Sequence, residues 1–268
     1  MENLHTLFDL TGKVAVVTGG YTGLGYDMAC ALSEYGATVV ISSRSREKAE
    51  NVARSMSETY HNRVIGLDLD QSNYDSCKTL ADSVHEECKR IDILINNAGG
   101  GSGKGKCNFL ERNPELMRSM IETNLLGPLF CCQSFGRYMV DQNSGSIINI
   151  ASIAGITGRD RSMYHKAKKE EQPVEYAASK GGIIGMTLDL AAYMAPFNVR
   201  VNAISPGGFD KGELTKAFVQ AYSERTPLGH MGVLNKEIMG TALFLASEAS
   251  SYITGQNIVV DGGFSTCR

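Results

Sequence analysis

Proline is scarce in this sequence, with 6 in 268 residues, and no proline-rich or serine-rich stretch separates one part of the chain from another. Charge of one sign is also lacking, since 26 basic and 29 acidic side chains leave a formal net charge of −3. Nucleic acids and anionic membranes select strongly basic surfaces, so we expect neither as a partner. With 43% hydrophobic residues, the chain can form one undivided domain over residues 1–268.

Long hydrophobic runs are absent too. No run approaches the roughly 18 apolar residues that a membrane-spanning helix needs. The opening "MENLHTLFDLTGK" lacks the basic and hydrophobic stretches of a signal peptide, so we expect a cytoplasmic protein. The 7 cysteines are odd in number and lack CxxC spacing, which indicates reduced thiols rather than disulfides or a structural metal site.

Short β-branched runs alternate along the chain with longer segments of helical spacing. The runs are "KVAVV", "ATVVIS", "RVIGL", "DILIN", "SIINIAS", "VRVNAIS" and "NIVVDGG". This alternation is typical of repeated βαβ units, and continuous apolar runs indicate strands covered on both faces. The sequence therefore predicts an α/β fold with a Rossmann-type, doubly wound parallel sheet, whose ligands bind beyond the carboxyl ends of the strands.

A glycine turn joins the first predicted strand to the next helix. In "VAVVTGGYTGLGYDMACAL", Gly19, Gly23 and Gly25 are spaced as TGxxxGxG, with Leu24 between the last two. Such glycines allow backbone N–H groups to approach a pyrophosphate at the positive end of a helix. The turn alone is modest evidence, because a tight strand-to-helix connection also uses glycine.

Two further loops are expected at the same edge of the sheet. "GLDLDQS" places Asp68 and Leu69 after the third strand, where the carboxylate can accept a hydrogen bond from an adenine amino group. "ILINNAGG" places Asn97, Ala98 and Gly99 after the fourth strand. Together with the glycine turn, these loops predict a dinucleotide site.

Several motifs follow one another in an order that is typical of one family. They are TGxxxGxG at residues 18–25, NNAG at 96–99, Asn124 in "ETNLLG", Ser152, YxxxK, "SPGG" at 205–208 and "ITGQNIVVDGG" near the end. On these motifs the chain resembles the short-chain dehydrogenase/reductase family from end to end, and its opening is similar to gluconate 5-dehydrogenase-like members. The resemblance implies a nicotinamide cofactor, a small carbonyl or alcohol substrate and a homotetramer.

The end of the second strand bears on which nicotinamide cofactor is used. NAD favours an acidic residue there, which accepts hydrogen bonds from ribose hydroxyls, whereas NADP favours an arginine near its 2′-phosphate. In "VVISSRSREK", Ser43 stands at the position of the acid and Arg44 follows it. This favours NADP and leaves NAD possible, since Thr22 departs from relatives with a second basic residue in the glycine turn.

Two tyrosine and lysine pairs compete for the catalytic role in "SIAGITGRDRSMYHKAKKEEQPVEYAASKGG". Tyr164 with Lys168 and Tyr176 with Lys180 share the same i, i+4 spacing. Tyr164 also lies nearer to the separation from Ser152 that is usual in the family. Spacing therefore does not decide between the pairs.

The expected packing of the two segments does decide. A tyrosine acts near neutral pH only if its pKa falls below about 10, which requires an adjacent ammonium on a rigid helix. "HKAKKEEQP", after Tyr164, is charged and shows no apolar face, whereas "AASKGGIIGMTLDLAAYMA", after Tyr176, can pack. We therefore assign Tyr176 and Lys180 and interpret residues 158–172 as a charged insertion. We expect the segment of Tyr164 to have no apolar face with which to dock, although Tyr164 could still touch the substrate from a loop.

The family resemblance implies a role for each residue of the assigned group. Tyr176 exchanges a proton with the substrate oxygen, Ser152 orients that oxygen, and Lys180 lowers the pKa of the tyrosine and binds the nicotinamide ribose. Asn124 holds a water molecule of a proton relay. Because asparagine is a mediocre helix former, its position also predicts a bulge in the surrounding helix.

The substrate is less well defined by the sequence. Pro206 and Gly207 are expected against the nicotinamide, and residues 207–230 over the substrate. The basic residues of two loops near this mouth are Lys104, Lys106, Arg159, Arg161, Lys166, Lys168 and Lys169. They favour a polar, anionic keto substrate such as a sugar acid, although nearby acidic residues equally allow a solvated charged loop. The alternatives are a 3-oxoacyl-thioester reductase and a nucleotide-binding regulator without turnover.

Overall fold

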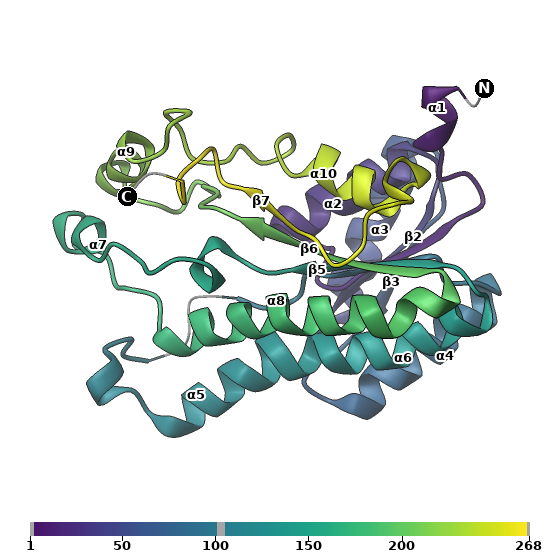
Figure 1. Cartoon of the computed structure of the whole chain (residues 1–268), viewed down its shortest axis with the longest axis horizontal. Helices are drawn as coiled ribbons and strands as arrows, with labels where there is room; N and C mark the ends of the chain where they lie inside the picture. The colour runs from purple at the N-terminus through teal and green to yellow at the C-terminus, as the bar shows by residue number, and fades with distance from the viewer. Residues whose placement is uncertain (1–2, 101–104, 267–268) are drawn as a thin grey trace.

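Seven strands form one sheet in the described part of the chain, residues 3–100 and 105–266 (Figure 1). They are β1 (Val14–Val17), β2 (Thr38–Ser43), β3 (Val64–Asp68), β4 (Ile93–Asn96), β5 (Gly145–Ile150), β6 (Val199–Pro206) and β7 (Asn257–Val260). Each coincides with one of the β-branched runs, so the predicted strands are confirmed. Lys104, one of the basic residues considered above, lies outside the described residues.

The strands are parallel throughout, in the order β3-β2-β1-β4-β5-β6-β7. The register pairs Val16 of β1 with Val40 of β2 on one side and with Leu94 of β4 on the other. The direction in which the sheet grows reverses at β1, and ligands of doubly wound sheets bind beyond the carboxyl ends at such a reversal. The Rossmann-type fold is therefore confirmed.

Helices cover both faces of the sheet (Figure 1). The α-helices of the described residues are α1 (Leu4–Leu7), α2 (Gly23–Glu34), α3 (Arg46–Tyr60), α4 (Tyr74–Cys88), α5 (Pro114–Ile121), α6 (Gly127–Asp141), α7 (Ser162–Lys166), α8 (Val174–Met194), α9 (Lys216–Glu224) and α10 (Met239–Ala246). Helices α2, α3 and α10 pack on one face, and α4, α6 and α8 on the other. No helix of the described residues is long and apolar enough to cross a membrane.

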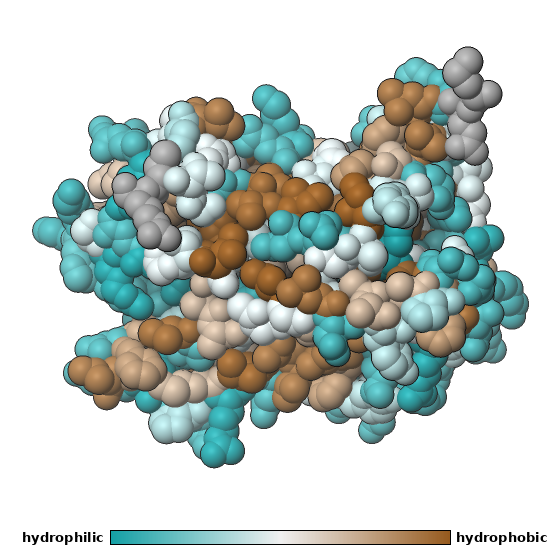
Figure 2. Space-filling model, in the orientation of Figure 1, coloured by the Kyte–Doolittle hydropathy of each residue, from teal (hydrophilic) through white to brown (hydrophobic). Residues whose placement is uncertain are grey.

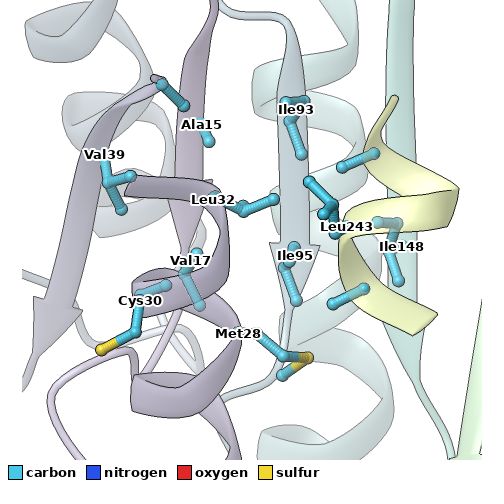
Figure 3. Close-up of a cluster of buried hydrophobic side chains, with 14 of the residues drawn as sticks. Ala15, Val17, Met28, Cys30, Leu32, Val39, Ile93, Ile95, Ile148 and Leu243 are labelled. Carbon is cyan, nitrogen blue, oxygen red and sulfur yellow. The ribbon is translucent and has the colours of Figure 1, made fainter. Parts of the chain in front are cut away.

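Each face of the sheet has its own hydrophobic core. Ala15 and Val17 of β1 belong to the core on the α2 side, where Figure 3 shows them with Leu32. Val14 and Val16 belong to the opposite core, because successive side chains of a strand point to opposite faces. Burial of each valine contributes about 1.5–3 kcal/mol. A strand that is covered on both faces therefore reads as an unbroken apolar run.

The charged segment at residues 158–172 docks on the domain. Met163 and Tyr164 of α7 are buried and pack against Phe218 and Tyr222 of α9, with the ring centroids of Tyr164 and Phe218 5.1 Å apart. Figure 1 shows α7 and α9 side by side beyond the sheet. The expectation that this segment has no apolar face with which to dock was wrong, because Met163 and Tyr164 suffice when a distant helix supplies their partner.

Candidate active site

The predicted site residues lie at the carboxyl edge of the sheet. They are Gly19, Gly23, Leu24 and Gly25 after β1, Ser43 and Arg44 at the end of β2, Asp68 and Leu69 at the end of β3, Asn97, Ala98 and Gly99 after β4, Ser152 after β5, and Pro206 and Gly207 at the end of β6. Asn124 lies between α5 and α6, and Tyr176 and Lys180 lie in α8. Because the strands are parallel, these segments converge on one edge.

The start of α2 is shaped for contact between its backbone and an anion. Gly23 has a φ of 55°, which glycine adopts without strain, and a β-carbon at Gly25 would collide with the side-chain amide of Asn97. Thr22, the N-cap, makes no side-chain cap hydrogen bond within the described chain, whereas Ser45 caps α3. The first N–H groups of α2 are therefore left for another acceptor, and this end fits a dinucleotide pyrophosphate.

Hydrogen bonds join the glycine turn to the loop after β4. The Thr18 hydroxyl accepts from the backbone N–H groups of Asn97 and Ala98, each at 3.0 Å. The Asn97 side chain donates in return to the carbonyl oxygens of Thr18 at 3.0 Å and Gly19 at 3.3 Å. The side chain of Asn97 therefore fixes the separation of the two loops that the sequence assigned to the dinucleotide.

Asn124 is buried in a π-helix, η2 (Glu122–Leu126), where the chain passes from α5 to α6. Its side-chain amide donates to the carbonyl oxygen of Met120 at 3.0 Å, and its Oδ1 accepts from the N–H of Gly100 at 3.1 Å. Short π-helical segments are rare and frequently occur at functional sites. The irregularity predicted from the poor helix propensity of asparagine is confirmed.

Ser152, Tyr176 and Lys180 come together between β5 and α8. Ser152 lies two residues after the end of β5, and its hydroxyl acts to lower the pKa of Tyr176 through hydrogen bonding. The buried ammonium of Lys180 donates to the carbonyl oxygen of Ile150 at 2.6 Å and lies 5.8 Å from the centre of the Tyr176 ring. One strand end and one helix face therefore hold the three side chains as a cluster.

Burial dominates the protonation chemistry of this cluster. It raises the pKa of Tyr176, and the hydrogen bond from Ser152 and the positive charge of Arg159 act in the opposite direction. Burial also lowers the pKa of Lys180 to about 8. The expectation that the lysine makes this tyrosine unusually acidic was therefore wrong, since removing the phenolate from water outweighs the stabilisation by its neighbours.

The end of β2 presents one unpaired basic residue. Ser43 is buried, and the side chain of Arg44 is exposed and makes no ion pair with any described residue. Arg46 is paired with Glu50 at 2.8 Å and lies 3.7 Å from Asp68. The Asp68 carboxylate thus lies near the Arg46 guanidinium, and Arg44 is the cation at this corner of the site that could bind a ligand.

Lys211 also lies at the glycine turn, which the sequence did not predict. A β-carbon built at Gly23 would be 2.8 Å from Nζ of Lys211. Asp210 accepts a hydrogen bond from the N–H of Gly212 at 2.9 Å, which closes a tight turn around the lysine. No local pattern could reveal this contact, because it depends on how the loop after β6 folds back over the start of α2.

The loop after β6 is held in place by α9. The hydroxyl of Tyr222 accepts from the N–H of Gly208 at 2.6 Å, and the N–H of Gly207 donates to the carbonyl oxygen of Val260 at 2.9 Å. Burial raises the pKa of Tyr222, so its hydroxyl stays neutral. Pro206 and Gly207 are thereby fixed at the sheet edge beside the cluster.

Tyr164 approaches the cluster from α7 but does not reproduce it. Helix α7 ends at Lys166, and beyond it Lys168 is exposed and has a φ of 49°. Tyr164 and Lys168 therefore share no helix face, despite their spacing. The charge of an ionised Tyr164 raises the pKa of Tyr176.

Two supporting contacts were missed by the sequence analysis. The Gln71 side chain donates to the carbonyl oxygens of Ala98 at 2.8 Å and Thr123 at 2.7 Å, and so ties the loop after β4 to η2. Arg112 and Glu175 form a buried ion pair at 2.7 Å that fixes the start of α8. Each contact joins segments far apart in the chain, and no motif marks either one.

The cysteine, acidic and histidine side chains of the described residues form neither a disulfide nor a metal site. The six described cysteines are free thiols. No group of three or more His, Cys, Asp or Glu side chains within residues 3–100 and 105–266 is arranged to hold a metal ion.

The fold and the site define a Rossmann-type nucleotide-binding protein with a serine, a tyrosine and a lysine clustered at its carboxyl edge. A family model described as "Enoyl-(Acyl carrier protein) reductase" matches residues 19–265. The chain belongs to the short-chain dehydrogenase/reductase family, and the resemblance seen in its motifs is confirmed.

Its relatives differ in the substrates that their names give. A 3-oxoacyl-(acyl-carrier-protein) reductase from Aquifex aeolicus is 35% identical, over 95% of this chain and 98% of the relative. An NADP-dependent mannitol dehydrogenase from Alternaria alternata is 32% identical, over 97% and 95%. The structure of a gluconate 5-dehydrogenase from Burkholderia cenocepacia in complex with NADP and tartrate is similar, with a TM-score of 0.89, 29% identity, and coverage of 99% of this chain and 100% of that one.

Proposed function

We propose that this protein is an NADP-linked oxidoreductase that interconverts a carbonyl group and a secondary alcohol. The observation that carries the proposal is the cluster of Ser152, Tyr176 and Lys180 beside the loops after β1, β4 and β6. Carbonyl reduction needs a proton donor, a group that polarises the carbonyl oxygen and a bound hydride donor, and this edge of the sheet has a place for each.

In the reductive direction, Tyr176 donates its phenolic proton to the carbonyl oxygen while a hydride reaches the carbonyl carbon. The nicotinamide supplies that hydride when it is bound. Ser152 donates the single proton of its hydroxyl to the same oxygen in a hydrogen bond, which polarises the carbonyl group. In the oxidative direction the phenolate takes the proton back. Because burial raises the pKa of Tyr176, we expect oxidation to accelerate as pH rises.

Lys180 and Asn124 complete the cluster in this proposal. The Lys180 ammonium donates one hydrogen bond to the carbonyl oxygen of Ile150, and its two other N–H groups can bind the hydroxyls of the nicotinamide ribose. Asn124 is fixed by Met120 and Gly100, and we assign to it the water of a proton relay.

Two cations at different places are available to bind the cofactor, and Arg44 is the one that supports a preference for NADP. Arg44 follows buried Ser43 at the end of β2, where the 2′-phosphate would lie, and Lys211 lies over the glycine turn, where the pyrophosphate would lie. The 2′-phosphate occurs only in NADP, whereas the pyrophosphate occurs in both cofactors. The two residues should therefore affect NADPH and NADH differently.

We predict that Arg44→Ala raises the Kd of NADPH about tenfold and leaves that of NADH nearly unchanged. Lys211→Ala should weaken both cofactors by similar factors. The measurement is a fluorescence titration with each reduced cofactor, and Arg46→Ala serves as the control because acids already pair its guanidinium. An equal loss of both cofactors in Arg44→Ala would contradict its assignment to the 2′-phosphate.

For the substrate, we propose a polar, anionic keto compound such as a sugar acid. Residues 207–230 contribute α9, which packs on α7, and the Tyr222 hydroxyl of α9 holds the loop after β6. Gluconate and mannitol dehydrogenases are among the similar proteins. A second candidate, a 3-oxoacyl-thioester reductase, is favoured by the 35% identity to the Aquifex aeolicus enzyme.

The deciding experiment is a substrate panel followed by cofactor absorbance, run with NADH and with NADPH. It should contain keto sugar acids, neutral ketoses and acetoacetyl thioesters. Turnover of the keto acids with NADPH supports the first proposal, and turnover of the thioesters alone supports the second. Tight NADPH binding without turnover of any carbonyl compound would instead indicate a regulator.

We also propose that the protein is a cytoplasmic homotetramer. Figure 2 shows hydrophobic side chains at the surface over β7 and along α8. The exposed apolar residues of these two elements are Val174, Leu188, Tyr193 and Val259. Strand β7 is an edge strand with exposed apolar area beside it, and association through such surfaces removes that area from water.

A further inference from the structure

Arg159 is a half-buried cation beside the proposed catalytic tyrosine. Its guanidinium carbon lies 5.4 Å from the centre of the Tyr176 ring. Nη1 donates to the carbonyl oxygens of Gln172 at 3.2 Å and Pro173 at 3.3 Å. Nη2 is shielded from solvent and has no hydrogen-bond partner among the described residues. One end of this guanidinium is therefore anchored, and the other end is unsatisfied.

Three cations of this region have acidic partners, whereas Lys166, Lys168 and Lys169 are exposed to solvent. The ion pairs are Lys106 with Glu111, Arg161 with Glu171, and Arg225 with Asp160. No carboxylate of the described residues pairs with Arg159. Burial lowers its pKa, but a guanidinium still remains charged at neutral pH. A partly buried charge without a counter-charge costs stability, so its retention here indicates a partner that arrives with the ligand.

The position of Arg159 suits a group attached to the reacting carbonyl. The guanidinium lies over the Tyr176 ring, and its charge lowers the pKa of both Tyr164 and Tyr176. Arg159 also lines a hollow of about 410 Å³ with Gly158, Val174 and Ala177. Ser152 and Tyr176 do not line this hollow, and Arg159 is the lining residue that also lies over the Tyr176 ring.

We propose that Arg159 binds the carboxylate of a small keto acid whose carbonyl oxygen contacts Tyr176. The planar guanidinium offers parallel N–H donors that match a carboxylate, which a lysine does not. This inference rests on the proposed function and sharpens it: of the seven basic residues in the two loops, Arg159 determines the preference for an anionic substrate. The ion-paired cations of the insertion hold α7 in place.

The kinetic test compares a keto acid with a neutral ketose of similar size, 5-keto-D-gluconate and D-fructose, using NADPH. Arg159→Met should lower the ratio of their kcat/KM values, acid over neutral, by at least about tenfold, mainly through the KM of the acid. Arg159→Lys should lower the ratio less. Lys166→Met removes an exposed cation from the same segment and should change the ratio less than about twofold.

A binding measurement makes the test independent of turnover. Titration calorimetry of tartrate into the NADP-saturated protein should give a Kd that Arg159→Met raises at least about tenfold and Lys166→Met leaves unchanged. Melting temperatures establish that each variant is folded, and Arg159→Lys carries the comparison if Arg159→Met does not fold.

The possible outcomes separate this proposal from the one on which it rests. Equal tartrate affinity in the wild type and Arg159→Met would overturn the role of Arg159, as would equal losses in Arg159→Met and Lys166→Met, or no binding by the wild type. If NADP binds but no carbonyl compound is reduced, the proposed function fails, while the tartrate titration still decides whether Arg159 receives an anion.

Discussion

Lys180 is the most constrained side chain of the cluster. It is buried, its ammonium donates to Ile150 at 2.6 Å, and burial lowers its pKa to about 8. At neutral pH the amine is still mostly protonated, so it can hold ribose hydroxyls and keep a positive charge 5.8 Å from the Tyr176 ring. The same burial that raises the pKa of Tyr176 thus makes its lysine neighbour easier to deprotonate.

This shift predicts that stability depends on pH through Lys180. Between its folded pKa of about 8 and the ordinary value of 10.5, the unfolded chain binds a proton that the folded protein has released. Stability contributed by this residue therefore rises with pH across that window, by on the order of 3 kcal/mol in total. Urea unfolding at pH 7.5 and pH 10 should show the gain in the wild type and not in Lys180→Met. Identical pH slopes would contradict the depressed pKa.

The choice between the tyrosines gives a second prediction at this scale. Tyr176→Phe removes the proton donor and should lower kcat by about 10²–10⁴-fold with the melting temperature nearly unchanged. Tyr164→Phe should retain most of kcat, because Tyr164 has no lysine on a shared helix face. Steady-state kinetics with any accepted ketone decide the matter, and a larger loss in Tyr164→Phe would reverse the assignment.

Which site residues could be predicted from the sequence depends on where their contacts lie. Asn124 and Ser152 stand in local motifs, so their types and order were sufficient to place them at the edge of the sheet. Lys211 and Arg112 act through contacts with segments far away in the chain, which no local pattern encodes. The pKa of Tyr176 was predicted with the wrong sign because burial cannot be judged from a neighbouring lysine alone.

Helix α8 is the element on which the proposed chemistry depends. It carries Tyr176 and Lys180, and its first turn is fixed by the buried ion pair of Glu175 with Arg112. The apolar run after Tyr176 was enough to predict that this helix packs. The docking of α7 could not be predicted in the same way. Its two apolar residues, Met163 and Tyr164, are buried only because α9 packs against them.

Breaking the buried pair should therefore loosen α8. Arg112→Met leaves the Glu175 carboxylate buried without its counter-charge and should destabilise the protein by about 3 kcal/mol or more. The double variant Arg112→Met with Glu175→Met should recover much of that loss, since it removes both charges. Urea unfolding curves of the three proteins measure the effect. A loss below about 1 kcal/mol in the single variant would mean that the pair does not anchor the helix.

At the scale of the whole molecule, a different set of helices covers each face of the sheet. Burial by α2, α3 and α10 on one face and by α4, α6 and α8 on the other leaves the carboxyl edge for ligands (Figure 1). The architecture could be predicted from seven apolar runs, because few chain topologies are compatible with a parallel sheet between two layers of helices. Assembly beyond one chain depends on surface shape, which such runs do not encode.

The proposed tetramer makes a prediction at this scale. Light scattering should give a mass near four times the 28.9 kDa of the chain. Leu188→Glu changes a side chain that is 56% exposed in one chain, so the stability of the isolated fold should change by less than about 0.5 kcal/mol. If α8 meets a second copy, the same substitution should reduce the mass. An unchanged mass would exclude this face of α8 from the assembly.

The contact between α7 and α9 has a consequence for anyone who exchanges parts between relatives. Met163 and Tyr164 on one segment, and Phe218 and Tyr222 on the other, complete each other across a long stretch of intervening chain. A chimera that receives only one of the two segments would expose an apolar surface to solvent, and we expect it to aggregate or to be degraded. Transplants that alter selectivity should therefore move both segments as a matched set.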